Sequence, residues 1–197
     1  MAKRKPTKKT VKKELLKLNL AGGQTRIPEF VNVDIAKLPE VDVVLDLTEF
    51  PWPWEENSVG EIQCSHYVEH TSNLIAFMDE CCRIMAPGAK MVITAPYYSS
   101  MRAAQDPTHL RAICESTFLY FNKGWMKSNR LDHYGIKSDF DFSYQYMLSP
   151  EWAVRSTETQ QFAIRNYINV VSDIVVTLVK RPHDGSIVPS GPGPEEI

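Results

Sequence analysis

The sequence predicts one α/β domain built on a doubly wound, mostly parallel sheet. A chain of 197 residues is long enough for a single well-buried domain and too short for two. Short runs of Val, Ile and Leu occur without clean polar alternation, which is typical of strands covered on both faces. We expect this domain over residues 14–181, between a basic disordered arm at residues 1–13 and a disordered tail at residues 182–197.

Five strand-like runs precede residue 97. They are expected at residues 15–20, 30–35, 41–47, 60–65 and 90–95. Between the last two, apolar side chains recur at three- and four-residue intervals over residues 73–85, which predicts an amphipathic helix that the Ala86-Pro87-Gly88 turn ends. The first crossovers are shorter than the dozen residues that a parallel connection normally needs, so we expect them to be reduced to loops and single turns.

The chain changes character after Pro96. Residues 97–149 are polar and aromatic without strong periodicity, and so long a connection in a compact domain is usually functional, so we expect it to cover the substrate. Within it, the run 140–146 fits either a substrate wall or core. Residues 162–167 and 173–180 have strand character and are expected to form a closing antiparallel pair at one sheet edge.

Composition narrows the class of protein. The hydrophobic share of 43% and charged share of 23% are ordinary for a globular protein, and no apolar run approaches the roughly 18 residues of a membrane span. No signal-peptide pattern follows the basic start, which indicates a cytoplasmic protein without membrane partners. The four cysteines lack zinc-ribbon spacing and are expected to be reduced, mostly buried thiols.

Net charge is distributed unevenly. Residues 1–17 contain eight Lys and Arg against one Glu, a balance of +7 within an overall charge of −2. Such an arm could contact nucleic acid or an acidic partner, but it lacks interleaved aromatic residues, and a solvated leader is the favoured interpretation. The aromatic segment Trp52-Pro53-Trp54 is interpreted as a hydrophobic plug over the sheet, because flanking acids would repel phosphate.

Polar or turn residues follow the first three expected strands. The Ala21-Gly22-Gly23 turn would let the backbone approach a ligand closely. Asp34 could accept hydrogen bonds from both hydroxyls of a ribose, and Asp46 from the exocyclic amine of adenine. Ligands of doubly wound sheets bind beyond the carboxyl ends of the strands, which is where these residues fall. Each alone is also explained as a plain turn or a cap.

In this order, the motifs resemble those of compact class I S-adenosylmethionine-dependent methyltransferases, the broad type 11 group. The matching segments lie between residues 15 and 118: the glycine turn at 19–24, Asp34, Asp46-Leu47, the aromatic segment 50–54, Glu69-His70 and the helix-ending turn 83–89. The resemblance implies a seven-stranded, Rossmann-like sheet with abbreviated early crossovers and an antiparallel C-terminal edge. It also implies S-adenosyl-L-methionine as cofactor and methyl transfer to a small-molecule acceptor.

The same resemblance implies a role for particular residues. Leu20, Ala21 and Gly22 would pass beside the methionine part of the cofactor. Asp34 would bind the ribose and Ile35 would lie beside the adenine. Asp46 and Leu47 would hold the adenine, and Ser65 and His66 would lie under the sulfonium. Ala21 and Ala89 depart from the glycines usual in this group, and Ala21 would cost on the order of 1 kcal/mol if its φ is positive.

Catalytic candidates follow the fourth and fifth expected strands. Positioning can supply most of the acceleration of methyl transfer, and a general base is needed only if the acceptor loses a proton. We select His66, Asp106 and His109 as catalytic candidates; Glu69, His70 and Tyr97 are further groups near the expected site.

Three alternatives remain in view. His66 and His70 have the HxxxH spacing of metal ligands, which Asp106 and His109 could complete, but His66 falls at a strand end rather than in a helix, so no metal site is predicted. The chain could instead be a catalytically weak methyltransferase-fold binding or assembly module. It could also be a nucleic-acid methyltransferase that uses the basic arm, with salt-sensitive binding.

Overall fold

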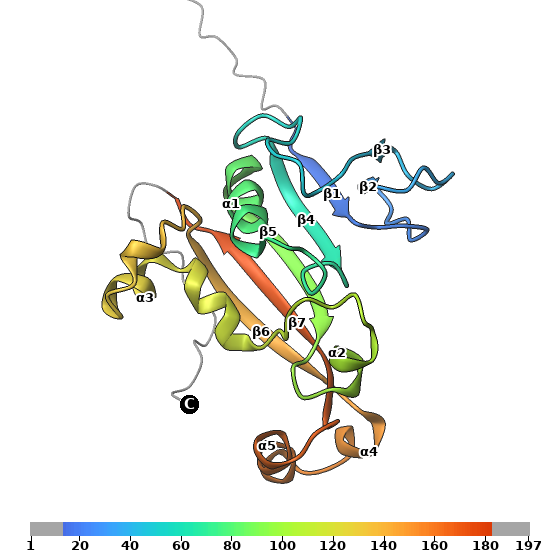
Figure 1. Ribbon diagram of the computed structural model, residues 1–197, viewed down its shortest axis with the longest axis vertical. Coiled ribbons are helices and arrows are strands. Elements are labelled where there is room, and N and C mark those ends of the chain that lie inside the picture. Colours follow the sequence, from blue (N-terminus) through green and yellow to red (C-terminus); the bar gives the residue numbers. More distant parts are fainter. Residues whose placement is uncertain (1–13, 183–197) are drawn as a thin grey trace, which may run out of the picture.

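A computed structural model describes residues 14–182 of the chain, and the expectations for the arm at 1–13 and for residues 183–197 lie outside them. Seven strands form one sheet in the order β3-β2-β1-β4-β5-β7-β6 (Figure 1). The strands are β1 (Leu16–Leu20), β2 (Val31–Asp34), β3 (Val43–Val44), β4 (Val59–Ser65), β5 (Met85–Pro96), β6 (Phe140–Leu148) and β7 (Val171–Lys180). Strands β1 to β5 are parallel and β7 runs antiparallel to β5 and β6, which confirms the predicted fold class.

The predicted amphipathic helix is α1 (Leu74–Ile84), between β4 and β5. Its first turn is capped by Asn73, whose side-chain Oδ1 accepts from the backbone N–H of Ala76. The other helices are short: α2 (Met101–Gln105), α3 (Lys123–Ser128), α4 (Pro150–Ala153) and α5 (Thr157–Asn166), with 3-10 turns η1 (Glu115–Phe121) and η2 (Asp132–Tyr134). None of the helices in residues 14–182 is long and apolar enough to cross a membrane.

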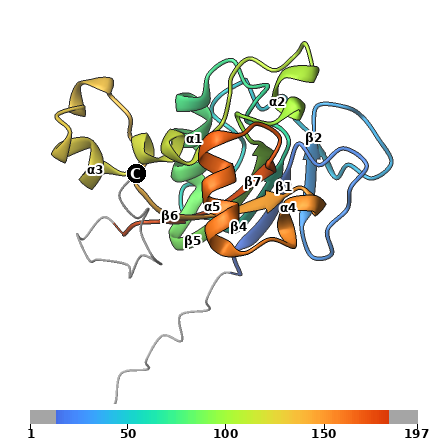
Figure 2. The ribbon, with the colours of Figure 1, turned by 90° about the horizontal axis from the view of Figure 1, so that it is seen from below.

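Helix α1 lies over one face of the sheet (Figure 2), whereas α4 and α5 lie beyond the end of β6 and β7 (Figure 1). On this face Ile62, Met91 and Leu178 lie in register and are fully buried, together with Phe77 of α1 and Phe118 of η1. On the other face the neighbouring residues of the same strands alternate with them and are half-exposed, as at Gln63, Val92 and Thr177. Coverage of both faces is therefore wrong for β4, β5 and β7, whose sequences contain more polar alternation than their Val and Ile content suggests.

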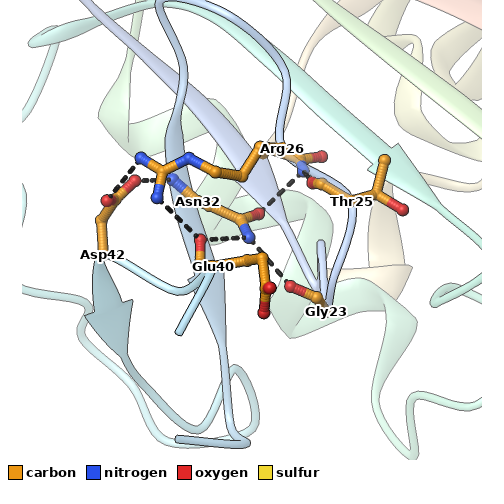
Figure 3. Close-up of polar contacts among 7 residues, drawn as sticks. Gly23, Thr25, Arg26, Asn32, Glu40 and Asp42 are labelled. Carbon is orange, nitrogen blue, oxygen red and sulfur yellow. Dashed lines mark hydrogen bonds and ion pairs between the residues drawn. The ribbon is translucent and has the colours of Figure 1, made fainter. Parts of the chain in front are cut away.

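The early crossovers are loops, as predicted, and residues 21–58 form no helix. Two buried amides hold these loops against β1 and β2 (Figure 3). The Asn32 side-chain Nδ2 donates to the carbonyls of Gly23 (3.0 Å) and Glu40 (2.9 Å). The Asn19 Nδ2 donates to Asn32 Oδ1 and to the carbonyl of Thr25, both at 2.8 Å. Side-chain amides thus satisfy loop backbone groups that a crossover helix would otherwise bond internally.

An ion pair continues this network toward solvent. Arg26 Nη2 lies 2.8 Å from Asp42 Oδ1, and the backbone N–H of Asn32 donates to the second carboxylate oxygen of Asp42 (2.8 Å) (Figure 3). The bond from Asn32 is the main reason that the pKa of the Asp42 carboxyl is lowered.

Four sequence-based assignments differ from the structure. The Ala86-Pro87-Gly88 segment, expected as a turn between helix and strand, lies within β5. The third strand is only Val43–Val44, because residues 45–47 already leave the sheet edge. Residues 162–167 are not a strand: 162–166 end helix α5, which Ser156 caps through a hydrogen bond from the Thr159 backbone N–H. The antiparallel partner of β7 is β6, which lies inside the segment 97–149. The run 140–146 is therefore sheet.

The remaining expectations about the core agree with the structure. Trp52 is almost fully buried and its ring packs edge-on against Phe77 of α1, with centroids 5.6 Å apart. The four cysteines are free thiols, with Cys64 and Cys81 buried and the other two half-buried. Burial raises the pKa of the Cys64 and Cys81 thiols.

Candidate active site

The candidate site lies along the edge where the parallel strands end. Leu20, Val33 and Cys64 are in register across β1, β2 and β4, and Ser65 pairs with Thr94 of β5. The residues directly after these positions therefore lie along one edge of the sheet. Antiparallel β7 begins at the same edge, where Asp173 pairs with Pro96.

The glycine turn after β1 is tightly constrained. Leu20 is fully buried, so its side chain belongs to the core and only its backbone faces the edge. Ala21 has φ of 53° and Gly23 has φ of 51°, both in the left-handed region. Ala21 thus carries the conformational cost of on the order of 1 kcal/mol expected for a non-glycine residue there. A Cβ at Gly22 would lie 1.9 Å from Asn32 Oδ1 and 2.2 Å from Asn19 Nδ2, so this position requires glycine.

Asp34 at the end of β2 is bonded directly to this turn. Its Oδ2 accepts from the Gly23 backbone N–H (2.9 Å) and its Oδ1 from the Ala36 N–H (2.8 Å). Each carboxylate oxygen can accept a second hydrogen bond, so the acid remains able to bind hydroxyl groups. Ile35, next to it, exposes 65% of its surface, an apolar side chain available to a flat ring.

Asp46 and Leu47 follow β3 and face different ways. The Asp46 Oδ1 accepts from both the backbone N–H (2.8 Å) and the hydroxyl (2.7 Å) of Thr48, and these bonds lower the pKa of the Asp46 carboxyl. Its Oδ2 has no such bond to Thr48. Leu47 is buried in the core, so its side chain anchors the loop and does not line the edge.

Ser65 and His66 end β4, and both are exposed. His66 has φ of 53°, a left-handed conformation that turns the chain sharply out of the strand. Its Nδ1 lies 3.4 Å from Glu69 Oε1, and this carboxylate raises the pKa of the His66 imidazole. Its Nε2 lies 4.0 Å from Asp173 Oδ1, while the other oxygen of Asp173 accepts a hydrogen bond from Arg102 (2.7 Å).

Asp106 and His109 belong to a turn that follows α2. Asp106 Oδ1 accepts from the backbone N–H and hydroxyl of Thr108, which lowers the pKa of the Asp106 carboxyl. His109 places its Nδ1 3.0 Å from the carbonyl of Ala103. Asp106 thus shapes the turn, since its bonds are those of a local cap.

The turns after β4 and after β5 are docked on one another. The backbone N–H of Leu110 donates to the carbonyl of Glu69 (2.8 Å), and Arg111 donates to the carbonyl of Thr71. This brings Glu69, His70 and His109 together, with one ligand atom from each lying within 4.8 Å of the others. Tyr97 is instead buried among aromatic rings, and burial raises the pKa of its hydroxyl.

The sequence hypothesis did not group Glu69 with the two histidines. It paired His66 with His70 by spacing, whereas the structure places His66 in the strand-ending turn. The useful signal was a pair of motifs: His-Tyr-Val-Glu-His, directly after β4, and Asp-Pro-Thr-His, which follows β5 and the short helix α2.

In the sheet, antiparallel β7 lies between β5 and β6, and this strand order identifies the class of fold. The structure is similar to an S-adenosylmethionine-dependent methyltransferase of Archaeoglobus fulgidus, with 17% identity, a TM-score of 0.58, and 85% of this chain and 87% of that chain covered. It is similar to one from Thermotoga maritima, with 11% identity, a TM-score of 0.53, and 87% and 84% covered. The chain has the class I methyltransferase fold.

No family model and no curated protein sequence matches the chain. The chain is therefore similar to these methyltransferases in fold, whereas its sequence identity to them is low. In this chain, residues 21–58 contain no helix.

Proposed function

We propose that the chain is an S-adenosylmethionine-dependent methyltransferase that acts on a small-molecule acceptor. The observation that carries the proposal is Asp34, fixed at the end of β2 by hydrogen bonds from Gly23 and Ala36. An acid at this place, beside a left-handed glycine turn, is suited to the two hydroxyls of a ribose.

The residues along the edge fit this cofactor. Asp34 keeps an open acceptor position on each oxygen, and exposed Ile35 offers an apolar surface for adenine beside it. Asp46 keeps its Oδ2 for an amine donor. An added Cβ at Gly23 would have only Asp34 Oδ2 within 4 Å, so the backbone at this turn is open to a ligand.

The cofactor supplies a methyl group on a positively charged sulfonium sulfur, which a nucleophile displaces in line. In our proposal, the chain acts mainly by positioning, which can contribute several kcal/mol of the barrier. Leu20, Ala21 and Gly22 contribute backbone to the methionine part, and Ser65 and His66 lie where the reacting atoms would meet. His66 is the most exposed of the three imidazoles at this edge, so it is the group placed to take a proton from an acceptor.

Asp106 and His109 are proposed as positioning residues. The turn that they form is docked on the segment after β4, and it would hold the acceptor side of the site. The segment 97–139 remains our proposal for the cover over the acceptor, whereas residues 140–148 belong to the sheet.

Calorimetry with S-adenosylmethionine and S-adenosylhomocysteine tests the proposal. Asp34→Asn keeps the size of the side chain and one acceptor oxygen for the loop, but it removes the charge. Because hydrogen bonds to a charged group contribute about 1.5–3 kcal/mol, affinity should fall roughly 10- to 100-fold. Glu49→Gln, an exposed charge removal after the third strand, is the matched control and should leave affinity unchanged.

Two results would contradict the proposal. One is the lack of heat from either ligand up to millimolar concentration with folded protein. The other is equal affinity in the Asp34→Asn and Glu49→Gln variants, because the acid would then have no part in binding.

A further inference from the structure

A buried carboxylate without a hydrogen bond lies at the acceptor side of the candidate site. Glu69 is 2% exposed, and neither side-chain oxygen has a hydrogen-bond partner in the described part of the chain. Its nearest charged neighbour is His66 Nδ1 at 3.4 Å, without hydrogen-bond geometry. Burying a carboxylate this way costs several kcal/mol unless a cation compensates it. Beyond this contact with His66, both carboxylate oxygens can still bind a cation.

Two imidazoles lie beside this carboxylate. Ligand atoms of Glu69, His70 and His109 all lie within 4.8 Å of one another, and the two rings meet edge-on with centroids 4.7 Å apart. The residues come from the turn after β4 and the turn after β5, which backbone hydrogen bonds hold together. The fold thus brings His109 next to Glu69 and His70, although these residues are far apart in the sequence.

Hydrogen bonds fix the orientation of both rings. The Thr108 hydroxyl gives its single proton to Asp106 Oδ1 (2.7 Å), so its oxygen accepts from His70 Nδ1, 3.0 Å away. His109 Nδ1 lies 3.0 Å from the carbonyl of Ala103, an acceptor only, so it must carry a proton. When the rings are neutral, this leaves Nε2 of each with its lone pair; His109 Nε2 lies 3.9 Å from Asp106 Oδ2. An imidazole held through Nδ1–H with Nε2 free is the usual state of a metal-binding histidine.

We propose that Glu69, His70 and His109 bind one divalent transition-metal ion. Two neutral imidazoles and one carboxylate form the ligand set of zinc and of related first-row metals, with further positions open to water or substrate. Tetrahedral ligands at about 2.0–2.2 Å from the ion lie roughly 3.4 Å apart, so ligand atoms that now lie within 4.8 Å of one another would draw together by up to about 1.4 Å. The Thr108 hydroxyl and the Ala103 carbonyl do not touch the ion; they hold the rings of His70 and His109 in the orientation that binding needs.

The position of the ion suggests what it does in the reaction, and this step rests on the proposed function. The three ligands follow β4 and β5, next to the turn where His66 would face the reacting atoms. An ion here would bind an oxygen of the acceptor and lower its pKa, making it a better nucleophile. The acceptor class that this favours is a molecule with a hydroxyl or paired oxygens.

Metal binding is tested on tag-free, full-length protein stripped with a chelator. Calorimetry with Zn²⁺ and with Co²⁺ should give one site per chain, and bound Co²⁺ should show the visible absorption of an ion with nitrogen ligands. Glu69→Gln and His109→Gln should each weaken binding at least roughly 100-fold, more than the loss of an orienting residue. Thr108→Val, which removes only the hydroxyl, should weaken binding roughly 10- to 100-fold.

His133→Ala is the matched control, because His133 is exposed and lies outside the cluster. It should bind both ions as the wild type does. Circular dichroism of each variant establishes that it is folded; should Glu69→Gln fail to fold, His109→Gln and Thr108→Val carry the test.

The proposal is overturned if folded wild-type protein binds neither ion, or if binding is equal in wild type and in the His109→Gln and Thr108→Val variants. In those cases the Glu69 carboxylate is paired with His66 alone. Calorimetry with S-adenosylmethionine on the same metal-free samples separates the two proposals. Cofactor binding without metal binding removes the metal site and leaves the methyltransferase proposal standing.

Discussion

Gly22 is the position in the candidate site where one added methyl group should have the largest effect. Its Cβ would fall 1.9 Å from Asn32 Oδ1 and 2.2 Å from Asn19 Nδ2, well inside contact distance. Both amides are almost fully buried and hold the loops after β1 and β2 through four hydrogen bonds. Gly22→Ala must therefore displace groups that have no solvent to turn toward.

The cost can be worked from these contacts. Forcing a methyl group into a packed site typically costs about 1–3 kcal/mol. Leaving one or more buried amide groups unsatisfied adds about 1–3 kcal/mol. We expect Gly22→Ala to lower the free energy of unfolding by about 2–6 kcal/mol, a large part of the roughly 5–15 kcal/mol of a typical domain. For a chain of this length, that is a fall in Tm on the order of 10 °C.

Urea unfolding followed by circular dichroism measures this change, with Gly88→Ala as the control. Gly88 has φ of 80° and no atom near its added Cβ, so alanine there carries only the conformational cost of about 1–2 kcal/mol. If Gly22→Ala destabilises the protein no more than Gly88→Ala does, the buried amide network does not constrain the turn and the reasoning fails.

Three further predictions follow from single contacts. Ala21→Gly should stabilise the protein by up to about 1.6 kcal/mol in urea unfolding. It relieves a left-handed alanine (about 1–2 kcal/mol) but gives the unfolded chain more freedom (about 0.4–1 kcal/mol), and a destabilised variant would contradict this. Burial alone would raise the pKa of the Glu80 carboxyl, but hydrogen bonds from Arg83 and Trp52 lower it below 4.5. The ionised carboxylate therefore stabilises the folded protein above pH 4.5, and this stabilisation is lost as the pH falls through the folded pKa. Glu80→Gln should therefore cost about 2 kcal/mol at pH 7 and progressively less below pH 4.5, and a pH-independent difference would refute the role of the charge. Alkylation with mass spectrometry at pH 8 should leave Cys64 and Cys81 unmodified in the native protein and modify them in urea, since burial raises both thiol pKa values; rapid native labelling would show that the core opens.

The sequence predicted the central sheet well, because the β-branched runs, the turns and the helix over α1 all point the same way. It was less informative wherever tertiary pairing overrides local preference. Residues 162–166 contain Phe and Ile and look like a strand, but the preceding Thr-Glu-Thr-Gln-Gln segment and the Ser156 cap place them in α5. Strand β6 could not be recognised from its sequence, because it lies in a polar and aromatic segment. Its long-range pairing with β7 identifies it.

The edge proposed to bind the cofactor could be expected from sequence because it depends on strand order alone. Asp34, Asp46 and the glycine turn each follow a strand of a parallel sheet, so their common edge follows from topology. The cluster of Glu69, His70 and His109 could not, because it depends on how two turns dock through the Leu110–Glu69 backbone hydrogen bond. No periodicity encodes a contact of that kind.

The helix-free crossovers change which residues hold the proposed cofactor site in place. In a doubly wound sheet, helices ordinarily fix the loops that follow the strands. Here the position of Asp34 depends on its bond to Gly23, whose carbonyl is held by Asn32, which in turn is bonded to Asn19. The two buried asparagines therefore fix the loops after β1 and β2, as a crossover helix does in other doubly wound sheets. It follows that cofactor affinity and stability should fall together in variants of Asn19 and Asn32, although neither side chain would touch the ligand.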